Sequence, residues 1–426
     1  MIELKKLDGP FGIPVYHQQM PEMVRAASLG WLIFTGAADD TSIASPGLHH
    51  WFEHVPFRGT KKYPAGASDI LGPFNNMNGY INAWTNHEAT CYYGHVHDTQ
   101  WKKALDVVTD MVANPLITDE GVEAERKVIH QEIAGSKDSA GGFARYELPG
   151  LLYPGHPFGH PVLGSEKTLA MMNAETLRRA HRLGYCRSRA VFFCVGNMSE
   201  RELLDKLHGA AAELPSKAFE PRRKPYYFGP LPEWRTDTIE IETEFEASVV
   251  MMLFPTQTNE GETANMTESV LTYGLLQNMF EHGGMTSPLM RIVREERQLV
   301  YGCSTRNATY AGGGYFGFKA TAKKENIPAI IEAFGDVMKD PALRSPVRLA
   351  EIKSGIRAEA DMMPLDPDDY RAKAIGQFIN CGGLMISHRA VVELMNKVTI
   401  DEVDAKLALL KPENARLVIF KGMGKS

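Results

Sequence analysis

Apolar and polar positions along the chain follow two periods, one typical of helices and one typical of strands. Apolar residues spaced three to four apart predict amphipathic helices at 104–113, about 119–134, 329–339 and about 347–361. Segments rich in β-branched and aromatic residues predict strands at 79–85, 89–96, 190–196, 239–254, 314–321 and 415–421. Because helices follow strands in groups, we expect an α+β fold of largely antiparallel sheets covered by helices on one face.

The order of these elements is the same in the two halves of the chain. Asp110, in the first predicted helix of the N-terminal half, corresponds to Asp336 in the C-terminal half. Each half also ends with a strand-like segment beside helices. Duplication of one α+β unit explains this order, and chance similarity between two common helix pairs is the alternative.

A proline-rich segment separates the two halves. Residues 214–232 contain five prolines and a basic cluster, which suits an extended linker and not a helix or a central strand. We therefore expect two homologous domains, residues 1–213 and 233–426, joined by a linker at 214–232.

Composition narrows the class of protein. Of the 426 residues, 44% are hydrophobic and 23% are charged, as in ordinary globular proteins, and the net charge of -6 argues against nucleic acid or an anionic membrane as partner. No run approaches the ~20 apolar residues of a membrane span, and the N-terminus lacks the apolar core of an export signal. The five cysteines are scattered without a C-x-x-C pair, so we expect a reducing, cytoplasmic setting.

The strongest chemical signal is the segment His50-Trp51-Phe52-Glu53-His54. Ser45-Pro46 before it predicts the start of a helix, on which His50, Glu53 and His54 share one face at about 100° per residue. Two imidazoles one turn apart can both bind Zn²⁺ at ~2.1 Å, and the adjacent carboxylate is placed to deprotonate a water at the metal. A five-residue motif is weak alone, and a solvated helix face with two histidines is the alternative.

A zinc site needs a third ligand, and the predicted helix from Asp119 offers candidates. Glu125 and Glu132 lie two turns apart on one face of that helix. By themselves they would be interpreted as a charged surface stripe.

These segments together resemble the pitrilysin/insulinase family of zinc peptidases with an inverted HxxEH motif, in its short, two-domain, processing-peptidase-like form. The resemblance spans nearly the whole chain. The segments that carry it are Gly47–Thr60, Asn82–Thr85 with Tyr92-Tyr93, Asn114–Ile133 and Gly283–Tyr301.

The resemblance implies a role for each matching residue. His50, His54 and Glu132 would bind one Zn²⁺ per chain, and Glu53 would take a proton from water and pass it to the leaving amine. Glu125 matches an acidic residue that assists from behind the ligands.

Substrate contacts are implied in the same way. Asn82, Ala83, Trp84 and Thr85 resemble the strand along which a peptide substrate lies as an added strand. Arg294 and Tyr301 resemble a pair that binds substrate and stabilises the oxyanion, since a guanidinium and a phenol can both donate to developing negative charge.

The second half lacks the zinc ligands. At the offset set by Asp110 and Asp336, Ala358 corresponds to Glu132, and residues 276–280 correspond to 50–54 without a histidine.

The resemblance implies a zinc endopeptidase acting on peptides or unfolded segments in a chamber formed by two chains. A homodimer is the simplest expectation; a heterodimer follows if Arg294 and Tyr301 must come from a different partner.

Two readings compete with an active peptidase. One is a peptide-binding or scaffolding member of the same family that has lost catalysis, against which the intact ligand set argues. The other is an unrelated metal-binding structural protein.

One departure from the family pattern is Pro56, two residues after His54, which removes a helix hydrogen bond and is expected to reshape the pocket without preventing zinc binding. His49 points about 100° away from His50 and is not expected to be a ligand.

Overall fold

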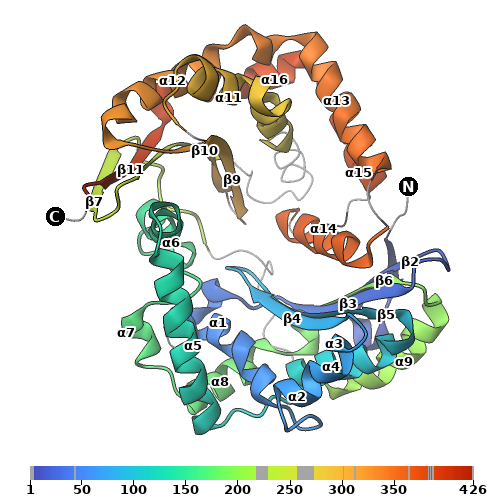
Figure 1. Ribbon diagram of the computed structural model, residues 1–426. Helices are drawn as coiled ribbons and strands as arrows, with labels where there is room; N and C mark the ends of the chain where they lie inside the picture. The colour runs from blue at the N-terminus through green and yellow to red at the C-terminus, as the bar shows by residue number, and fades with distance from the viewer. Residues whose placement is uncertain are drawn as a thin grey trace.

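The chain folds around two β-sheets, one built from each half (Figure 1). The computed structural model describes residues 4–42, 45–216, 229–256, 273–300, 302–310, 313–362, 365–381, 383, 385 and 388–424. The strands of the first sheet are β1 (Lys5–Asp8), β2 (Pro14–Gln19), β3 (Ala26–Ile33), β4 (Tyr80–Thr85), β5 (Thr90–His97) and β6 (Ala190–Gly196). Those of the second are β7 (Thr238–Thr243), β8 (Ser248–Thr256), β9 (Gly302–Tyr310), β10 (Gly313–Ala322) and β11 (Arg416–Gly422).

The two sheets share one topology. Their strand orders are β1-β2-β6-β3-β5-β4 and β7-β11-β8-β10-β9, so every strand of the second sheet has a counterpart in the first. In each sheet one pair is parallel, β2 with β6 and β7 with β11, and the other pairs are antiparallel. Five matching strands in one order are what duplication of an α+β unit predicts.

Helices of each half cover one face of the sheet of that half. The first half contributes α1 (Leu48–His54), α2 (Ala67–Ile70), α3 (Gly72–Asn75), α4 (Trp101–Ala113), α5 (Asp119–Lys137), α6 (Ala140–Leu152), α7 (Glu166–Leu169), α8 (Ala174–Gly184) and α9 (Glu200–Glu213). The second contributes α11 (Pro288–Met290), α12 (Ile327–Lys339), α13 (Pro346–Asp361), α14 (Pro367–Asn380), α15 (His388–Lys397) and α16 (Ile400–Leu407). The described helices include none that is long and apolar enough to cross a membrane.

The central strands are apolar on both faces. In β3, Leu29 and Trp31 face the helices of the first half, whereas Leu32 points to the opposite face. In β8, Val250 and Met252 face the helices of the second half, whereas Val249 and Met251 point away from them. Because side chains alternate along a strand, both faces of each sheet need a cover.

The second cover of each sheet comes from the other half of the chain. Helix α6 leaves the first half and packs Ala144 and Leu148 against Val249 and Val418 of the second sheet. Helix α14 leaves the second half and packs Phe378 on the first sheet, where it contacts strands β3 and β6. Figure 1 shows α6 rising beside the second sheet and α14 lying over the first. The two halves are therefore joined by an exchange of helices.

The structure differs from the sequence prediction in several strands. Residues 239–254 form two strands, β7 and β8, because residues 244–247 bend the chain between them. Strands β1, β2, β3 and β9 were not predicted. The four predicted helices correspond to α4, α5, α12 and α13 within three residues at each end. Part of the predicted linker, residues 217–228, lies outside the described residues.

Candidate metal centre

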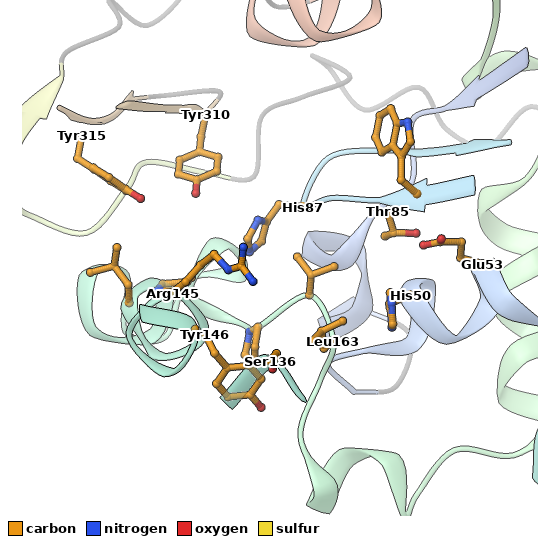
Figure 2. A pocket seen from close by; sticks show the side chains of 16 residues that line it. His50, Glu53, Thr85, His87, Ser136, Arg145, Tyr146, Leu163, Tyr310 and Tyr315 are labelled. Carbon is orange, nitrogen blue, oxygen red and sulfur yellow. The ribbon is translucent and has the colours of Figure 1, made fainter. Parts of the chain in front are cut away.

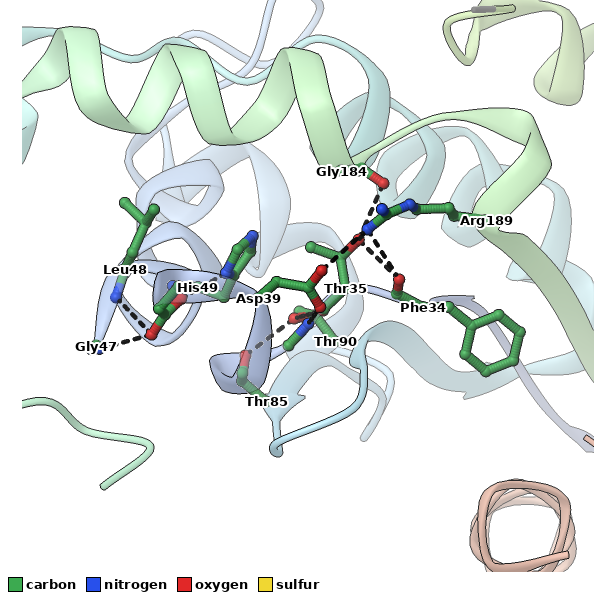
Figure 3. Close-up of polar contacts among 12 residues, drawn as sticks. Phe34, Thr35, Asp39, Gly47, Leu48, His49, Thr85, Thr90, Gly184 and Arg189 are labelled. Carbon is green, nitrogen blue, oxygen red and sulfur yellow. Dashed lines mark hydrogen bonds and ion pairs between the residues drawn. The ribbon is translucent and has the colours of Figure 1, made fainter. Parts of the chain in front are cut away.

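Helix α1 carries the HxxEH segment and begins later than Ser45-Pro46 predicts. It starts at Leu48, after Gly47 in a left-handed conformation with φ of 94°. The cap comes from the buried carboxylate of Asp40, which accepts hydrogen bonds from the backbone N–H groups of Gly47 at 2.7 Å and of Leu48 and His49 at 3.1 Å each (Figure 3). A carboxylate at a helix N-terminus satisfies donors that have no partner within the helix.

Asp40 also holds the side chain of His49. The Nδ1 atom of His49 lies 2.5 Å from the carboxylate, and both side chains are fully buried. His49 therefore points into the domain and does not face the neighbouring metal group. Figure 3 shows the same region continuing to Asp39, which forms an ion pair with Arg189 at 3.3 Å.

The end of helix α1 follows from Pro56. The helix ends at His54, and residues Val55–Arg58 continue as a 3₁₀ turn. Proline has no N–H to donate to Phe52, so the helix cannot continue through it. His50 and His54 lie before this point on one face, with ring centroids 4.8 Å apart. The proline closes the helix without disturbing the two imidazoles.

Glu132 joins the two histidines from helix α5. Its Oε2 atom lies 3.5 Å from Nε2 of His50 and 3.5 Å from Nε2 of His54. Two imidazole nitrogens and one carboxylate form a donor set typical of catalytic zinc sites, and tetrahedral Zn²⁺ with bonds of ~2.1 Å needs ligand atoms about 3.4 Å apart. Among the described residues, this is the one group of three that could hold a metal ion. The donor set and its spacing fit zinc.

A buried ion pair orients His54. Its Nδ1 atom lies 3.0 Å from Oε2 of Glu125, which precedes Glu132 by two turns of α5. The second oxygen of Glu125 accepts from the guanidinium of Arg58. With the proton of His54 on Nδ1 and directed at Glu125, Nε2 presents its lone pair toward Glu132. Such a carboxylate behind a ligating histidine fixes the tautomer that binds metal.

Burial and neighbouring charges shift the pKa values of His50, His54 and Glu53 in different directions. Burial and the neighbouring His54 lower the pKa of His50 to about 3, so its imidazole is neutral at physiological pH. Burial alone would lower the pKa of His54, but the hydrogen bond to Glu125 and the charges of Glu132 and Glu53 outweigh it and raise that pKa. Burial raises the pKa of Glu53 more than the hydrogen bond from Thr85 lowers it. A carboxylate with a raised pKa is suited to exchange protons.

Two cavities meet at His50 and Glu53. One, of about 730 Å³, includes the whole metal group together with Asn82 of strand β4. The other, of about 510 Å³, extends from His50, Glu53 and Thr85 toward the second half, where Tyr310 and Tyr315 line it (Figure 2). Strand β4 is the last strand of its sheet and pairs on one side only, with β5.

Arg294, one of the two residues expected to bind substrate, does not line either cavity. Arg294 lies in a π-helical turn, Arg291–Glu296, and forms an ion pair with Glu295 at 3.6 Å. It is absent from the described lining of both cavities. Tyr301 lies outside the described residues.

The corresponding positions of the second half are apolar. Leu276 and Phe280, which match His50 and His54, are fully buried in the second core. A group like the one on α1 and α5 is therefore not built there from the described residues.

Several residues that shape the site were not predicted from the sequence. Asp40 and His87 belong to no recognisable motif: Asp40 accepts hydrogen bonds from residues seven to nine positions ahead, and His87 lines the cavity from a separate segment. Arg145 and Tyr310 were missed because helix α6 and strand β9 meet only through the exchange between halves. Arg58 lies in Gly47–Thr60, one of the segments that carry the family resemblance, but the resemblance gave it no role.

Comparison with known families gives two matches that together cover most of the chain. Residues 19–165 match the family described as Insulinase (Peptidase family M16). Residues 172–353 match the family described as Peptidase M16 inactive domain. The second description agrees with the apolar residues at the positions that would correspond to the ligands.

Relatives of similar length carry a consistent description. An uncharacterized zinc protease from Streptomyces coelicolor is 27% identical over 98% of this chain and 86% of its own length. An uncharacterized zinc protease from Bacillus subtilis is 28% identical over 79% of both chains.

Solved structures show the same fold. A protease from Helicobacter pylori aligns with a TM-score of 0.82 at 16% identity and covers 99% of this chain and 100% of its own. Pitrilysin aligns with a TM-score of 0.78 at 18% identity, over 99% of this chain and 45% of its own. With family matches in both halves and relatives along its whole length, the chain belongs to the insulinase family of peptidases.

Proposed function

We propose that the protein is a zinc-dependent endopeptidase that hydrolyses peptides or unfolded segments of polypeptide. The observation that supports this best is the convergence of Nε2 of His50, Nε2 of His54 and a carboxylate oxygen of Glu132 beside Glu53. Zn²⁺ held there would polarise the scissile carbonyl and lower the pKa of a water ligand towards 7.

Glu53 would supply the proton transfers. Its carboxylate lines both cavities, and its raised pKa favours accepting a proton from water and returning it to the leaving amine. The hydroxyl of Thr85 orients it through a hydrogen bond.

Substrate binding would use the free edge of strand β4. A peptide added along Asn82, Ala83, Trp84 and Thr85 would be fixed by backbone hydrogen bonds and would pass beside Glu53. Backbone pairing makes little demand on side chains, so peptides of varied sequence would bind.

A second copy of the chain would complete the site. Arg294 does not line either cavity, so we propose that Arg294 and Tyr301 act on the substrate of a partner chain in a homodimer, with a heterodimer as the alternative. In this proposal residues 1–213 form the catalytic domain, 214–232 the linker and 233–426 the domain that supplies the pair.

Metal removal and restoration test the proposal. Purified protein is treated with a chelator, dialysed and assayed on a library of unstructured peptides, with cut sites mapped by mass spectrometry. We expect loss of cleavage without metal and recovery with one equivalent of Zn²⁺ per chain. Cleavage that is indifferent to the chelator would contradict a zinc mechanism.

A further inference from the structure

The cavity that extends from His50 and Glu53 toward the second half is lined on its far side by a guanidinium and by phenols. Helix α6 forms one side of it, and the second half closes its far end with two phenols, those of Tyr310 and Tyr315. Figure 2 shows Arg145 of α6 reaching between these phenols and the end of the cavity where Glu53 and Thr85 lie. A chain segment bound at Glu53 would therefore point toward Arg145 on this side.

Arg145 carries an unpaired charge into this cavity. It forms no ion pair or hydrogen bond with any of the residues that the structure describes. The described lining contains one carboxylate, Glu53, which the proposed reaction already uses. The charge of Glu88 raises the pKa of Tyr310, and that of Glu147 raises the pKa of Tyr146, but neither glutamate lines the cavity.

Two further cations lie on the side of Arg145 that faces the second sheet. The ammonium of Lys319 lies 3.3 Å from the point where a Cβ atom on Gly141 would stand. Gly141 and Arg145 are one turn apart on α6, so Lys319 and Arg145 share one face of that helix. The absence of a side chain on Gly141 leaves room for the lysine.

The sheet register brings the third cation to the same face. Arg306 pairs with Gly317 across β9 and β10, two residues from Lys319 and on the face that contacts α6. Burial and the charges of Arg306 and Arg145 lower the pKa of the Lys319 ammonium. Neither Arg306 nor Lys319 has an ion pair among the described residues. No anion of the described residues pairs with these three cations, and although water screens the exposed Arg145 and Arg306, a bound anion would relieve the repulsion that remains.

We propose that this cavity selects peptide substrates that place a carboxylate against Arg145, close to the bond that is cut. The proposal rests on the endopeptidase function above and adds its substrate class. The phenols of Tyr310 and Tyr315 provide further donors, since burial raises the pKa of both and keeps them protonated. The carboxylate comes either from an acidic side chain or from the C-terminus of the peptide.

Peptides that differ in a single charge test the selection. One series carries Glu, Gln or Lys stepped through the positions on both sides of a mapped cut site. Each peptide is made with a free and with an amidated C-terminus, which separates the two sources of carboxylate. Cleavage is measured with wild-type protein, and binding is measured by fluorescence polarisation with the Glu53→Gln protein. The binding arm keeps the test independent of catalysis.

Charge variants identify the residues responsible. Arg145→Gln and Lys319→Gln remove a cation each, and Arg145→Glu reverses one. Arg179→Gln on the exposed side of α8 is the matched control, since Arg179 forms no contact with the described residues of the cavity. Circular dichroism verifies that each variant folds. If the Arg145 variants do not fold, the change in preference is measured with Lys319→Gln.

We expect wild-type protein to prefer Glu over Gln at one position, or the free over the amidated C-terminus, by about 10- to 100-fold. Arg145→Gln should bring the ratio of Glu to Gln cleavage, or of free to amidated cleavage, to about one, and Arg145→Glu should favour Lys. Equal binding of Glu, Gln and Lys peptides by the Glu53→Gln protein, together with equal binding of the free and amidated peptides, would overturn the proposal. Charge-dependent binding without any cleavage by wild-type protein would support this cavity and contradict the endopeptidase function instead.

Discussion

The guanidinium carbon of Arg371 lies 3.7 Å from the centre of the Tyr93 ring, although the two residues belong to different halves of the chain. Arg371 is almost fully buried and also binds Asp368 at 2.7 Å and the hydroxyl of Ser28 at 2.7 Å. Asp368 accepts further hydrogen bonds from Ser28 at 2.6 Å and from Tyr80 at 3.0 Å. This cluster fixes α14 to the sheet whose edge, β4, is the proposed substrate strand.

Replacement of Asp368 should loosen that attachment. Asp368→Asn leaves the buried charge of Arg371 without its partner, and we expect a loss of about 3 kcal/mol in the free energy of unfolding at pH 7. Urea denaturation measures it. Asp369→Asn, at the exposed neighbouring position, is the control and should change stability by less than about 0.5 kcal/mol.

The effect of Asp368→Asn should depend on pH. Burial would raise the pKa of Asp368, but the charge of Arg371 and the hydrogen bonds from Ser28, Arg371 and Tyr80 outweigh it and lower that pKa. The folded pKa is therefore below the unfolded value of about 3.9, so the stabilisation is complete above about pH 5 and is lost as pH falls through the folded pKa. A difference between wild type and variant that stays constant down to pH 3 would contradict this assignment.

The fold was predictable from the sequence where the pattern is local. Helices α4, α5, α12 and α13 follow from their apolar spacing, because an amphipathic helix repeats its buried face every three to four residues. Strand β9 is polar and lies at a sheet edge, and β3 is apolar on both faces, so neither shows the alternation of a half-buried strand. The exchange of α6 and α14 depends on contacts between residues far apart in sequence.

The cap on helix α1 gives a second prediction. Asp40→Asn keeps the shape of the side chain but weakens four hydrogen bonds, those from three backbone N–H groups and from His49. We expect a loss of about 2–4 kcal/mol in unfolding free energy and weaker zinc binding, since the ligands His50 and His54 follow directly.

Thermal unfolding with and without zinc, beside a zinc competition titration, measures both effects of Asp40→Asn. The control is Asp8→Asn on the exposed strand β1, for which both quantities should stay at the wild-type values. Normal zinc affinity in a destabilised Asp40→Asn protein would show that the cap supports the domain but does not position the ligands.

Glu125 should affect metal affinity without being a ligand. Glu125→Gln removes the carboxylate that holds Nδ1 of His54, and zinc affinity should fall about 10- to 100-fold while binding of one equivalent persists. A competition titration against a chelating dye gives the affinity. Glu120→Gln, exposed on the same helix, should bind zinc as wild type does, and equal affinity of the Glu125 variant would remove the role assigned to this contact.

The site itself was predictable in part, for a physical reason. His50, Glu53 and His54 share a helix face by geometry alone, and Glu132 was named because of the family resemblance. Arg58 acts through a contact with Glu125 on a distant helix, and Asp40 acts through side-chain bonds to residues just ahead of it, and neither kind of contact leaves a periodic trace in the sequence. The family resemblance assigned Arg294 and Tyr301 to the substrate, and their role stays a prediction because Arg294 lines neither cavity and Tyr301 lies outside the described residues.

The most direct test of the account measures zinc content and peptide cleavage together in wild type and Glu53→Gln. Glu53 lies beside the three proposed ligands but is not one of them, so the variant should still bind one zinc per chain. We expect its cleavage rate to fall at least about 100-fold, as loss of a general base requires. Wild-type protein without zinc, or a variant that cleaves at the wild-type rate, would contradict the proposed peptidase mechanism.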